Sequence, residues 1–292
     1  MHSATPEPAR NLAGGLWLIA DMCLNIWALS IVKAVGLDFP PTQIVLLRAV
    51  TGLTLMLPWI WRERAAFAKP DDLPLHLLRV MLSTITLTAS FFAIARVPFA
   101  LFTAMNFTRP LVLMAMAALF LSERVTPRRW LAGMVALVGV LIAVDPSGTG
   151  SLNWGLPALV LTILAGTGAV IVTRRLKSAP TIVLMTFYTG GLAVLISPFA
   201  LASWQEVSAK EWPALLAVGL FAQSAQFCFL QAHKRAEAAC LAVLGYGSLV
   251  ISAAVGYTIF NEPISLRFVL GACMIICAAA WGTVFATRRT GV

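Results

Sequence analysis

Two residues of opposite charge interrupt long apolar stretches of this sequence. Asp21 lies within the stretch 12–34, and Arg109 lies within the stretch 98–121. An ionisable side chain near the centre of a bilayer costs about 2.5–3.5 kcal/mol, so each needs a partner or a water-filled cavity. Counted along helices from the same membrane face, the two charges lie at depths of about 14 Å and about 18 Å. They could form an ion pair, or they could face one cavity and bind the two ends of a zwitterion.

Further polar and aromatic residues fall at similar depth on shared helix faces. Residues three or four apart lie on one face, as Trp17, Asp21 and Asn25 do. A serine or threonine can bond to its own helix backbone, whereas an Asn or Gln amide is harder to satisfy locally. The predicted ligand-binding set is Trp17, Asp21, Asn25, Thr84, Thr88, Phe91, Asn106, Arg109, Phe187, Gln223, Gln226, Tyr246 and Ser248.

Other polar residues have simpler expected roles. Arg48 lies near one end of the stretch 41–60, and its long side chain is expected to extend to the membrane surface. Glu123 and Glu262 precede Thr126 and Ser265, where a carboxylate suits the start of the following helix better than a gate. Glycines expected to allow close helix packing are Gly166, Gly168, Gly190 and Gly191.

The helices that must position these residues are those of an integral membrane protein. Of 292 residues, 60% are hydrophobic and 11% are charged, against about 25% charged in a typical soluble domain. The net charge is +9, but the basic residues are scattered between apolar stretches, so no nucleic-acid partner is expected. The first stretch is longer than a signal-peptide core and has no small-residue cleavage site after it, so it is expected to be retained.

No catalytic residue, metal site or cofactor is predicted. The five cysteines lie inside apolar stretches, without neighbouring histidine or carboxylate ligands. The sequence also lacks a nucleophile elbow, a zinc-binding histidine–glutamate motif and a phosphate-binding loop. The chain is therefore not expected to be an enzyme.

Apolar stretches bounded by proline, glycine and charge predict ten membrane-spanning helices. They lie near 12–34, 41–60, 73–95, 98–121, 127–145, 153–174, 180–202, 211–232, 238–260 and 265–286. Fifteen of the 21 Lys and Arg residues, Arg64 and Arg79 among them, fall at the termini and one set of connections, and four fall at the opposite set. The positive-inside rule then places both termini in the cytoplasm.

The two halves of the chain resemble each other. With a shift of 139 residues, Arg96 coincides with Arg235, and Glu123 with Glu262. Five spans in each half make the second half upside down relative to the first, as in transporters built from inverted repeats. The predicted organisation is a cytoplasmic tail (1–11), a first repeat (12–145), an inverted second repeat (153–286) and a second tail (287–292). The fold class is all-α, with ten helices around a central cavity.

An ordered set of motifs resembles the drug/metabolite transporter superfamily, specifically its EamA-like family. The first half reads Ala95-Arg-Val-Pro-Phe-Ala100 and Ser122-Glu-Arg-Val-Thr126, and the second reads Lys234-Arg-Ala-Glu-Ala-Ala239 and Asn261-Glu-Pro-Ile-Ser265. The resemblance covers nearly the whole chain. It implies a multi-pass carrier of the bacterial cytoplasmic membrane whose cavity lies between the halves, most like the YddG-type aromatic amino-acid exporters.

The expected function is export of amino acids, aromatic or neutral, and related small metabolites by alternating access. A sparse polar cluster at mid-depth favours a carrier over a channel with a repeated polar ring. The alternative is a proton-coupled multidrug exporter of lipophilic cations, for which Asp21 is the one deep carboxylate. The expected partners are a small-molecule substrate and the lipid bilayer, with the protein a monomer. The sequence favours neither proton coupling nor facilitated diffusion.

Overall fold

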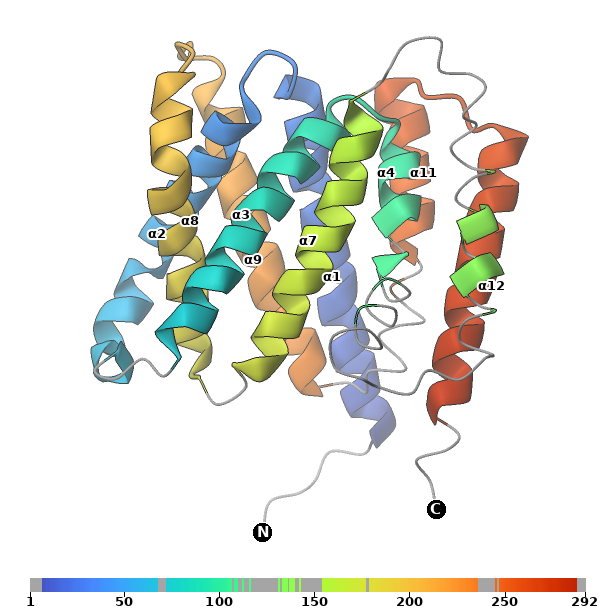
Figure 1. Cartoon of the computed structure of the whole chain (residues 1–292), viewed down its shortest axis with the longest axis horizontal. Helices are drawn as coiled ribbons and strands as arrows, with labels where there is room; N and C mark the ends of the chain where they lie inside the picture. The colour runs from blue at the N-terminus through green and yellow to red at the C-terminus, as the bar shows by residue number, and fades with distance from the viewer. Residues whose placement is uncertain are drawn as a thin grey trace.

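The computed structural model of this chain describes residues 7–67, 72–106, 154–176, 179–235 and 247–287, together with shorter pieces at 108–109, 112, 116, 131, 133–135, 137–139, 142 and 245. In this described part every regular element is a helix, and the long helices stand side by side in one bundle (Figure 1). The helices are α1 (Glu7–Val35), α2 (Pro41–Arg62), the short 3₁₀ helix η1 (Arg64–Phe67), α3 (Leu73–Ile94), α4 (Phe99–Asn106), α7 (Gly155–Arg175), α8 (Thr181–Ala202), α9 (Trp212–Arg235), α11 (Gly247–Phe260) and α12 (Leu266–Thr287).

The length and composition of these helices confirm an all-helical, multi-pass membrane protein. Six of them, α1, α2, α3, α7, α8 and α9, are long and apolar enough to cross a bilayer, and two shorter apolar helices cover Gly247–Phe260 and Leu266–Ala278. The predicted spans at 98–121, 127–145 and 238–260 lie partly or largely outside the described residues. The number ten therefore stays a prediction.

Helices α2 and α8 repeat each other in detail. Each has 22 residues and begins directly after a proline in extended conformation: Pro40 has φ −57° and ψ 135°, and Pro180 has φ −56° and ψ 142°. Each also contains an internal proline one turn before its end, Pro58 and Pro198. Proline has no N–H to bond to the preceding turn. In α8 the hydroxyl of Ser197 donates to the carbonyl of Val194 that Pro198 leaves unpaired, at 2.9 Å.

The helix pairings are symmetric between the two halves. By order in the chain, α1, α2, α3 and α4 correspond to α7, α8, α9 and α11. The most extensive contacts join α1 to α9 and α3 to α7. These two pairs are equivalent, because α7 corresponds to α1 and α3 corresponds to α9. The α2–α9 and α3–α8 contacts form a second such pair, and α2–α8 and α4–α11 each join a helix to its own counterpart. These helices enclose the centre of the bundle.

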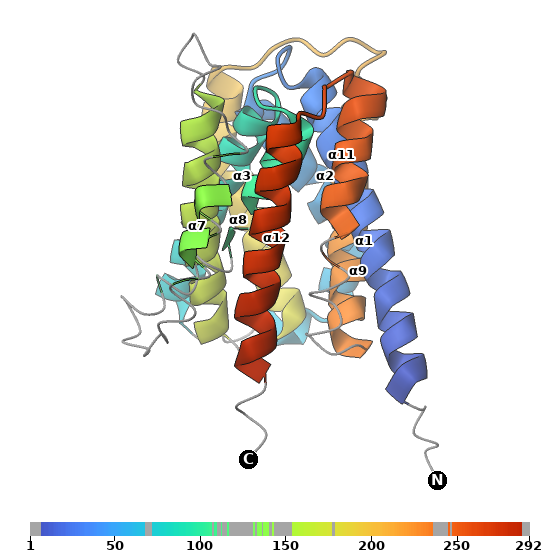
Figure 2. The same ribbon diagram turned by 90° about the vertical axis from the view of Figure 1, so that its right-hand side faces the viewer.

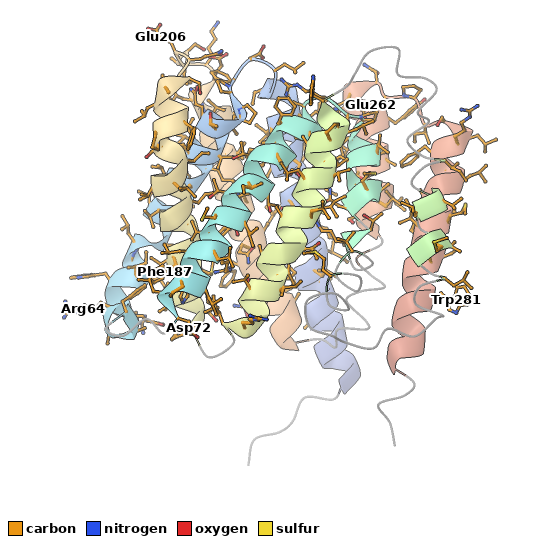
Figure 3. The ribbon with its side chains drawn as sticks, in the orientation of Figure 1. Arg64, Asp72, Phe187, Glu206, Glu262 and Trp281 are labelled. Carbon is orange, nitrogen blue, oxygen red and sulfur yellow. The ribbon has the colours of Figure 1, made fainter. Side chains whose placement is uncertain are left out.

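Corresponding helices also run in opposite directions. Glu206, which follows α8, and Glu262, which follows α11, lie at one end of the bundle (Figure 3). Arg64, which follows α2, and Asp72, which precedes α3, lie at the other end. The first turn of α1 and the last turn of α12 are also at the Arg64 end, as two perpendicular views show (Figures 1 and 2).

Glycines allow the closest helix crossings. A Cβ atom on Gly219 of α9 would lie 2.5 Å from the Thr51 Cβ of α2, and one on Gly191 of α8 would lie 2.8 Å from a Val80 methyl group of α3. These are the corresponding crossings of the two halves, and no larger residue fits without separating the helices. Gly191 therefore has the expected packing role, whereas a Cβ on Gly190 would meet nothing within 4 Å.

Candidate ligand-binding cavity

A cavity of about 640 Å³ lies among the helices of both halves. Its wall is formed by residues of α1, α2, α3, α4, α7, α8, α9 and α11, together with Arg109. This volume lies within the range of sites for small molecules. Eight residues of the predicted set line it: Asp21, Asn25, Phe91, Asn106, Arg109, Gln223, Gln226 and Ser248.

The rest of the predicted set lies elsewhere. Trp17 packs edge-on against Phe227, and Phe187 stacks on His76 with ring centroids 4.6 Å apart. The cavity-facing side of α3 carries Arg79, Ser83, Thr86, Leu87, Phe91 and Ser90. Thr84 and Thr88 fall outside this lining, and the Thr84 hydroxyl donates to the Val80 carbonyl at 2.8 Å. Tyr246 lies outside the described residues.

Asp21 and Arg109 face the same cavity, which is one of the two arrangements left open by the sequence. The Asn25 amide donates to the Asp21 carboxylate at 2.9 Å, one helical turn away. Among the ion pairs of the described residues, none joins Asp21 to Arg109. The Arg109 guanidinium lies against α7, where a Cβ on Gly166 would be 3.3 Å from its Nη2. Its Nε is buried and has no hydrogen-bond partner among the described residues.

The expectation that Arg48 extends to the membrane surface is wrong. Arg48 lines the cavity, and its Nη1 is buried with no hydrogen-bond partner in the described part of the chain. The reason is the position of α2, which packs between α8 and α9 and so carries Arg48 on a face that points into the bundle.

Sequence reasoning also missed Arg79, which it assigned to the cytoplasmic connections. In the structure the Arg79 Nε donates to the Thr173 hydroxyl of α7 at 2.8 Å, and its Nη1 donates to the Leu184 carbonyl of α8 at 2.8 Å. The guanidinium also lies 5.6 Å from the ring centre of Tyr188. Arg79 is therefore a fixed part of the cavity wall that joins three helices. Its place well inside α3 was the available signal.

The amide side chains are held in different ways. The Gln223 side chain of α9 packs against Gly52 of α2. A Cβ atom on Gly52 would lie 2.9 Å from the Gln223 Oε1. The Asn106 amide donates to the Phe102 carbonyl of its own helix at 2.7 Å, so local bonding is open to an amide as well, contrary to the expectation. Ser248 bonds locally as expected, with its hydroxyl 2.8 Å from the Gly245 carbonyl.

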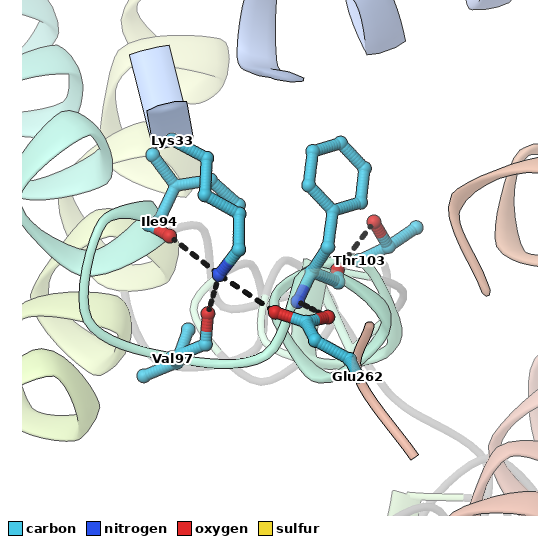
Figure 4. Close-up of polar contacts among 6 residues, drawn as sticks. Lys33, Ile94, Val97, Thr103 and Glu262 are labelled. Carbon is cyan, nitrogen blue, oxygen red and sulfur yellow. Dashed lines mark hydrogen bonds and ion pairs between the residues drawn. The ribbon is translucent and has the colours of Figure 1, made fainter. Parts of the chain in front are cut away.

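A cluster around Glu262 joins several helices at one end of the bundle (Figure 4). The Lys33 ammonium at the end of α1 lies 2.8 Å from the Glu262 carboxylate. It also donates to the carbonyls of Val97 at 2.7 Å and Ile94 at 3.3 Å. The other Glu262 oxygen accepts the backbone N–H of Phe99, the first residue of α4, at 2.7 Å. The cluster therefore joins the ends of α1, α3 and α11 to the start of α4.

This arrangement corrects the expected role of Glu262. The carboxylate stabilises the start of α4, which is distant in sequence, and not the start of the helix that follows it. At α12 the Ser265 hydroxyl accepts the Phe268 N–H at 3.1 Å, which is the expected capping role of Ser265. Glu123 lies outside the described residues.

Membrane-length helices from two oppositely directed halves around a central cavity are the usual architecture of a membrane transporter. Comparison with known proteins makes the assignment: the chain belongs to the EamA-like transporter family, whose sequence model matches it twice, over residues 13–144 and 153–283.

Similar proteins are transporters of different substrates. The chain is 27% identical over 253 residues to a pseudopaline exporter of Pseudomonas aeruginosa, covering 85% of this chain and 88% of the exporter. It is 28% identical to a riboflavin transporter of Brucella anthropi, covering 83% and 87% of the two chains. It is 25% identical to an S-adenosylmethionine uptake transporter of Rickettsia felis, covering 84% of each.

A solved structure supports the fold. It covers 94% of this chain and 98% of its own, with a TM-score of 0.65 and 20% sequence identity. The drug/metabolite transporter assignment made from the sequence is confirmed at the level of the family.

Proposed function

We propose that this protein is a secondary transporter that exports a small metabolite across the bacterial cytoplasmic membrane by alternating access. The observation that carries the proposal is the cavity of about 640 Å³ lined by helices of both halves, with the Lys33–Glu262 cluster joining helices at one end of the bundle. If both termini face the cytoplasm, as the basic residues predict, the Glu262 end is the outer one. In this proposal the cluster closes the outer end, and the described conformation loads substrate from inside.

The symmetric pairings support a mechanism by which the open end of the cavity changes from one side of the membrane to the other. The α1–α9 and α3–α7 pairs are equivalent contacts of two oppositely directed halves. Exchanging the conformations of the two halves opens the Glu262 end and closes the other end around the same central site. No separate energy-coupling domain is needed, because the substrate gradient or a coupled ion supplies the work.

Within this function, the proposed substrates are amino acids, aromatic or neutral, and related small metabolites. Asp21 and Arg109 give the wall charges of both signs, and Phe91 and Tyr188 add aromatic surface. The relatives are named for pseudopaline, riboflavin and S-adenosylmethionine, so this family carries substrates of different chemistry. Export is the proposed direction, as for the pseudopaline exporter.

The second candidate, a proton-coupled exporter of lipophilic cations, rests on Asp21 as a deep carboxylate. Against it stand three arginines in the same wall, Arg48, Arg79 and Arg109. Like charges in a site of low dielectric repel strongly. A cationic drug in this cavity would meet one carboxylate and three guanidinium groups of the described lining.

Flux across a reconstituted membrane tests the proposal. Vesicles containing the purified protein should take up labelled phenylalanine faster than empty vesicles, and Gln223→Leu should slow that uptake without lowering the amount of folded protein. Replacing Val194, an exposed residue of α8 outside the cavity lining, by leucine is the matched control. Uptake of tetraphenylphosphonium without any uptake of amino acids or other metabolites would replace this proposal with the drug-exporter alternative.

A further inference from the structure

We propose that the substrate of this cavity carries two anionic groups, and that Arg48 and Arg109 are the residues that bind them. This inference rests on the proposed transport function and narrows its substrate class from amino acids in general to an anionic amino acid or related metabolite. The shared chemistry is a dianion, in which each group is a carboxylate or a phosphate ester.

The first argument is the balance of charge. The described lining of the cavity contains three guanidinium groups, on Arg48, Arg79 and Arg109, and one carboxylate, on Asp21. Charges that line one cavity among apolar helices are screened less than charges on an open surface, so an excess of positive charge favours an anion. A zwitterion brings no net charge and leaves the excess in place.

The second argument is that Arg48 and Arg109, unlike Arg79, have buried N–H donors without a hydrogen-bond partner among the described residues. Arg79 is already held by the Thr173 hydroxyl and the Leu184 carbonyl, each at 2.8 Å. In contrast, the Nη1 of Arg48 and the Nε of Arg109 are buried without a hydrogen-bond partner among the described residues. A buried donor left without an acceptor costs about 1–3 kcal/mol, and more when it is charged. Both arginines line the cavity, so a shift of either side chain towards an anionic ligand would give its buried donor an acceptor and remove this cost.

The third argument is position. Arg48 lies about 10 Å along α2 from the first residue of that helix, which is at the Glu262 end. Arg109 follows α4, which begins at the same end. Asp21 lies about 21 Å along α1 from that end. A ligand bound through both Arg48 and Arg109 is therefore expected nearer the Glu262 end than Asp21 is.

The Arg109 guanidinium also occupies a space that Gly166 leaves open on α7. A Cβ on Gly166 would lie 3.3 Å from the Arg109 Nη2 and 3.1 Å from a Thr86 methyl group, so the absence of a side chain makes room for the guanidinium. A guanidinium placed in this way can form two parallel hydrogen bonds to one carboxylate or phosphate.

Binding to the purified full-length protein tests the inference with three probes of similar size and one larger cation. Phenylsuccinate carries two carboxylates, and O-phospho-L-serine carries a carboxylate and a phosphate with a net charge of about −2. L-phenylalanine is a zwitterion, and tetraphenylphosphonium is the cation. Each probe is titrated while the thermal unfolding of the protein is followed, because a ligand of the folded state raises Tm. One of the two dianions should bind at least about tenfold more tightly than L-phenylalanine, and its identity distinguishes carboxylate from phosphate chemistry.

Substitutions then assign the effect to the two arginines. Arg48→Gln and Arg109→Gln should each weaken dianion binding about tenfold and leave L-phenylalanine binding less affected. Arg64→Gln removes the same charge from an exposed position at one end of the bundle and should change neither. If Arg109→Gln does not fold, Arg109→Lys keeps the charge but loses the forked geometry, and it should still weaken dianion binding.

Three results would overturn the inference. Equal or tighter binding of L-phenylalanine, together with its transport into vesicles, rejects the dianion and leaves the proposed transport function standing. Dianion binding that is unchanged in both Arg48→Gln and Arg109→Gln rejects the assigned residues. If vesicles transport none of the four probes or any other metabolite, the proposed function fails, and the inference fails with it.

Discussion

At the residue scale, two glycines determine where the polar side chains of the cavity lie. Gly166 leaves space for the Arg109 guanidinium, and Gly52 leaves space for the Gln223 amide. A Cβ atom on Gly166 would lie 3.3 Å from the Arg109 Nη2, and one on Gly52 would lie 2.9 Å from the Gln223 Oε1, both closer than ordinary packing. We therefore expect both glycines to affect substrate binding indirectly, because they leave room for the Arg109 and Gln223 side chains.

Gly166→Ala should reduce substrate binding without destabilising the protein. The new methyl group displaces Arg109 by a few tenths of an ångström and misaligns its hydrogen bonds, so we expect affinity to fall about 3- to 10-fold. Alanine is the better helix former by up to about 1 kcal/mol. This gain opposes the tight contact of the new methyl group with the Thr86 methyl group, so Tm should change little. Ligand titration and thermal unfolding of the same variant measure both effects.

Gly190→Ala is the matched control, because a Cβ there meets nothing within 4 Å and Gly190 is not part of the cavity lining. It should leave affinity unchanged. Equal affinity in Gly166→Ala and Gly190→Ala would show that Gly166 does not position Arg109.

At the element scale, the turn after α11 joins helices that are far apart in the sequence. Asn261 has a left-handed φ of 51°, which returns the chain so that the Glu262 N–H donates to the Gly256 carbonyl at 3.0 Å. The Glu262 carboxylate then reaches both Lys33 of α1 and the first N–H of α4. The Lys33 and Glu262 side chains are 12% and 19% exposed, so water weakens their ion pair only in part.

Glu262→Gln should favour opening of this end of the bundle. The amide oxygen can still accept the Phe99 N–H, but the ion pair with Lys33 is lost. Loss of a charged hydrogen bond of about 1.5–3 kcal/mol corresponds to a shift of about tenfold or more in the population open at this end. A cysteine at Thr103, which lines the cavity, should react faster with a membrane-impermeant thiol reagent added from the Glu262 side, in a background without the native cysteines.

The control for this experiment is Glu206→Gln, an exposed acidic residue at the same end of the bundle (Figure 3). It removes the same charge and should leave the labelling rate unchanged. Equal labelling of Thr103→Cys in the Glu262→Gln and parent proteins would show that the Lys33–Glu262 cluster does not hold this end closed.

At the scale of the whole molecule, the symmetry of the packing and the distribution of charge make one prediction about orientation. The Glu206 and Arg64 ends of the bundle are opposite ends. The sequence predicts that most Lys and Arg residues belong to the termini and connections on the Arg64 side. The positive-inside rule then places the Arg64 end in the cytoplasm.

Reporter fusions measure this orientation directly. Alkaline phosphatase, which is active only outside the cytoplasm, should be active when inserted next to Glu206 and inactive when inserted next to Arg64. Green fluorescent protein should show the reverse. The opposite pattern would reverse the membrane orientation, and it would make the closed end the cytoplasmic one.

Much of the architecture could be predicted from the sequence because membrane helices are determined locally. Each must bury about 20 consecutive apolar residues and pair its own backbone groups, so apolar length and proline positions predict its limits. The predicted spans 41–60 and 180–202 differ from α2 and α8 by no more than two residues at either end. The polar residues of the first, fourth and eighth predicted spans, Asp21, Asn25, Asn106, Gln223 and Gln226, likewise line the cavity.

Only the tertiary structure decided which helix faces meet at the centre. Periodicity shows which residues share a face, but not which face a neighbouring helix covers. For this reason the sequence placed Arg48 at the membrane surface and Arg79 in a connection, whereas both line the cavity. The partners of Glu262 are likewise beyond local reasoning, since Lys33 and Phe99 are far away in the chain and meet it only when α1, α4 and α11 pack together. The sequence by itself determined the class of protein and its polar residues, and packing decided which of them form a site.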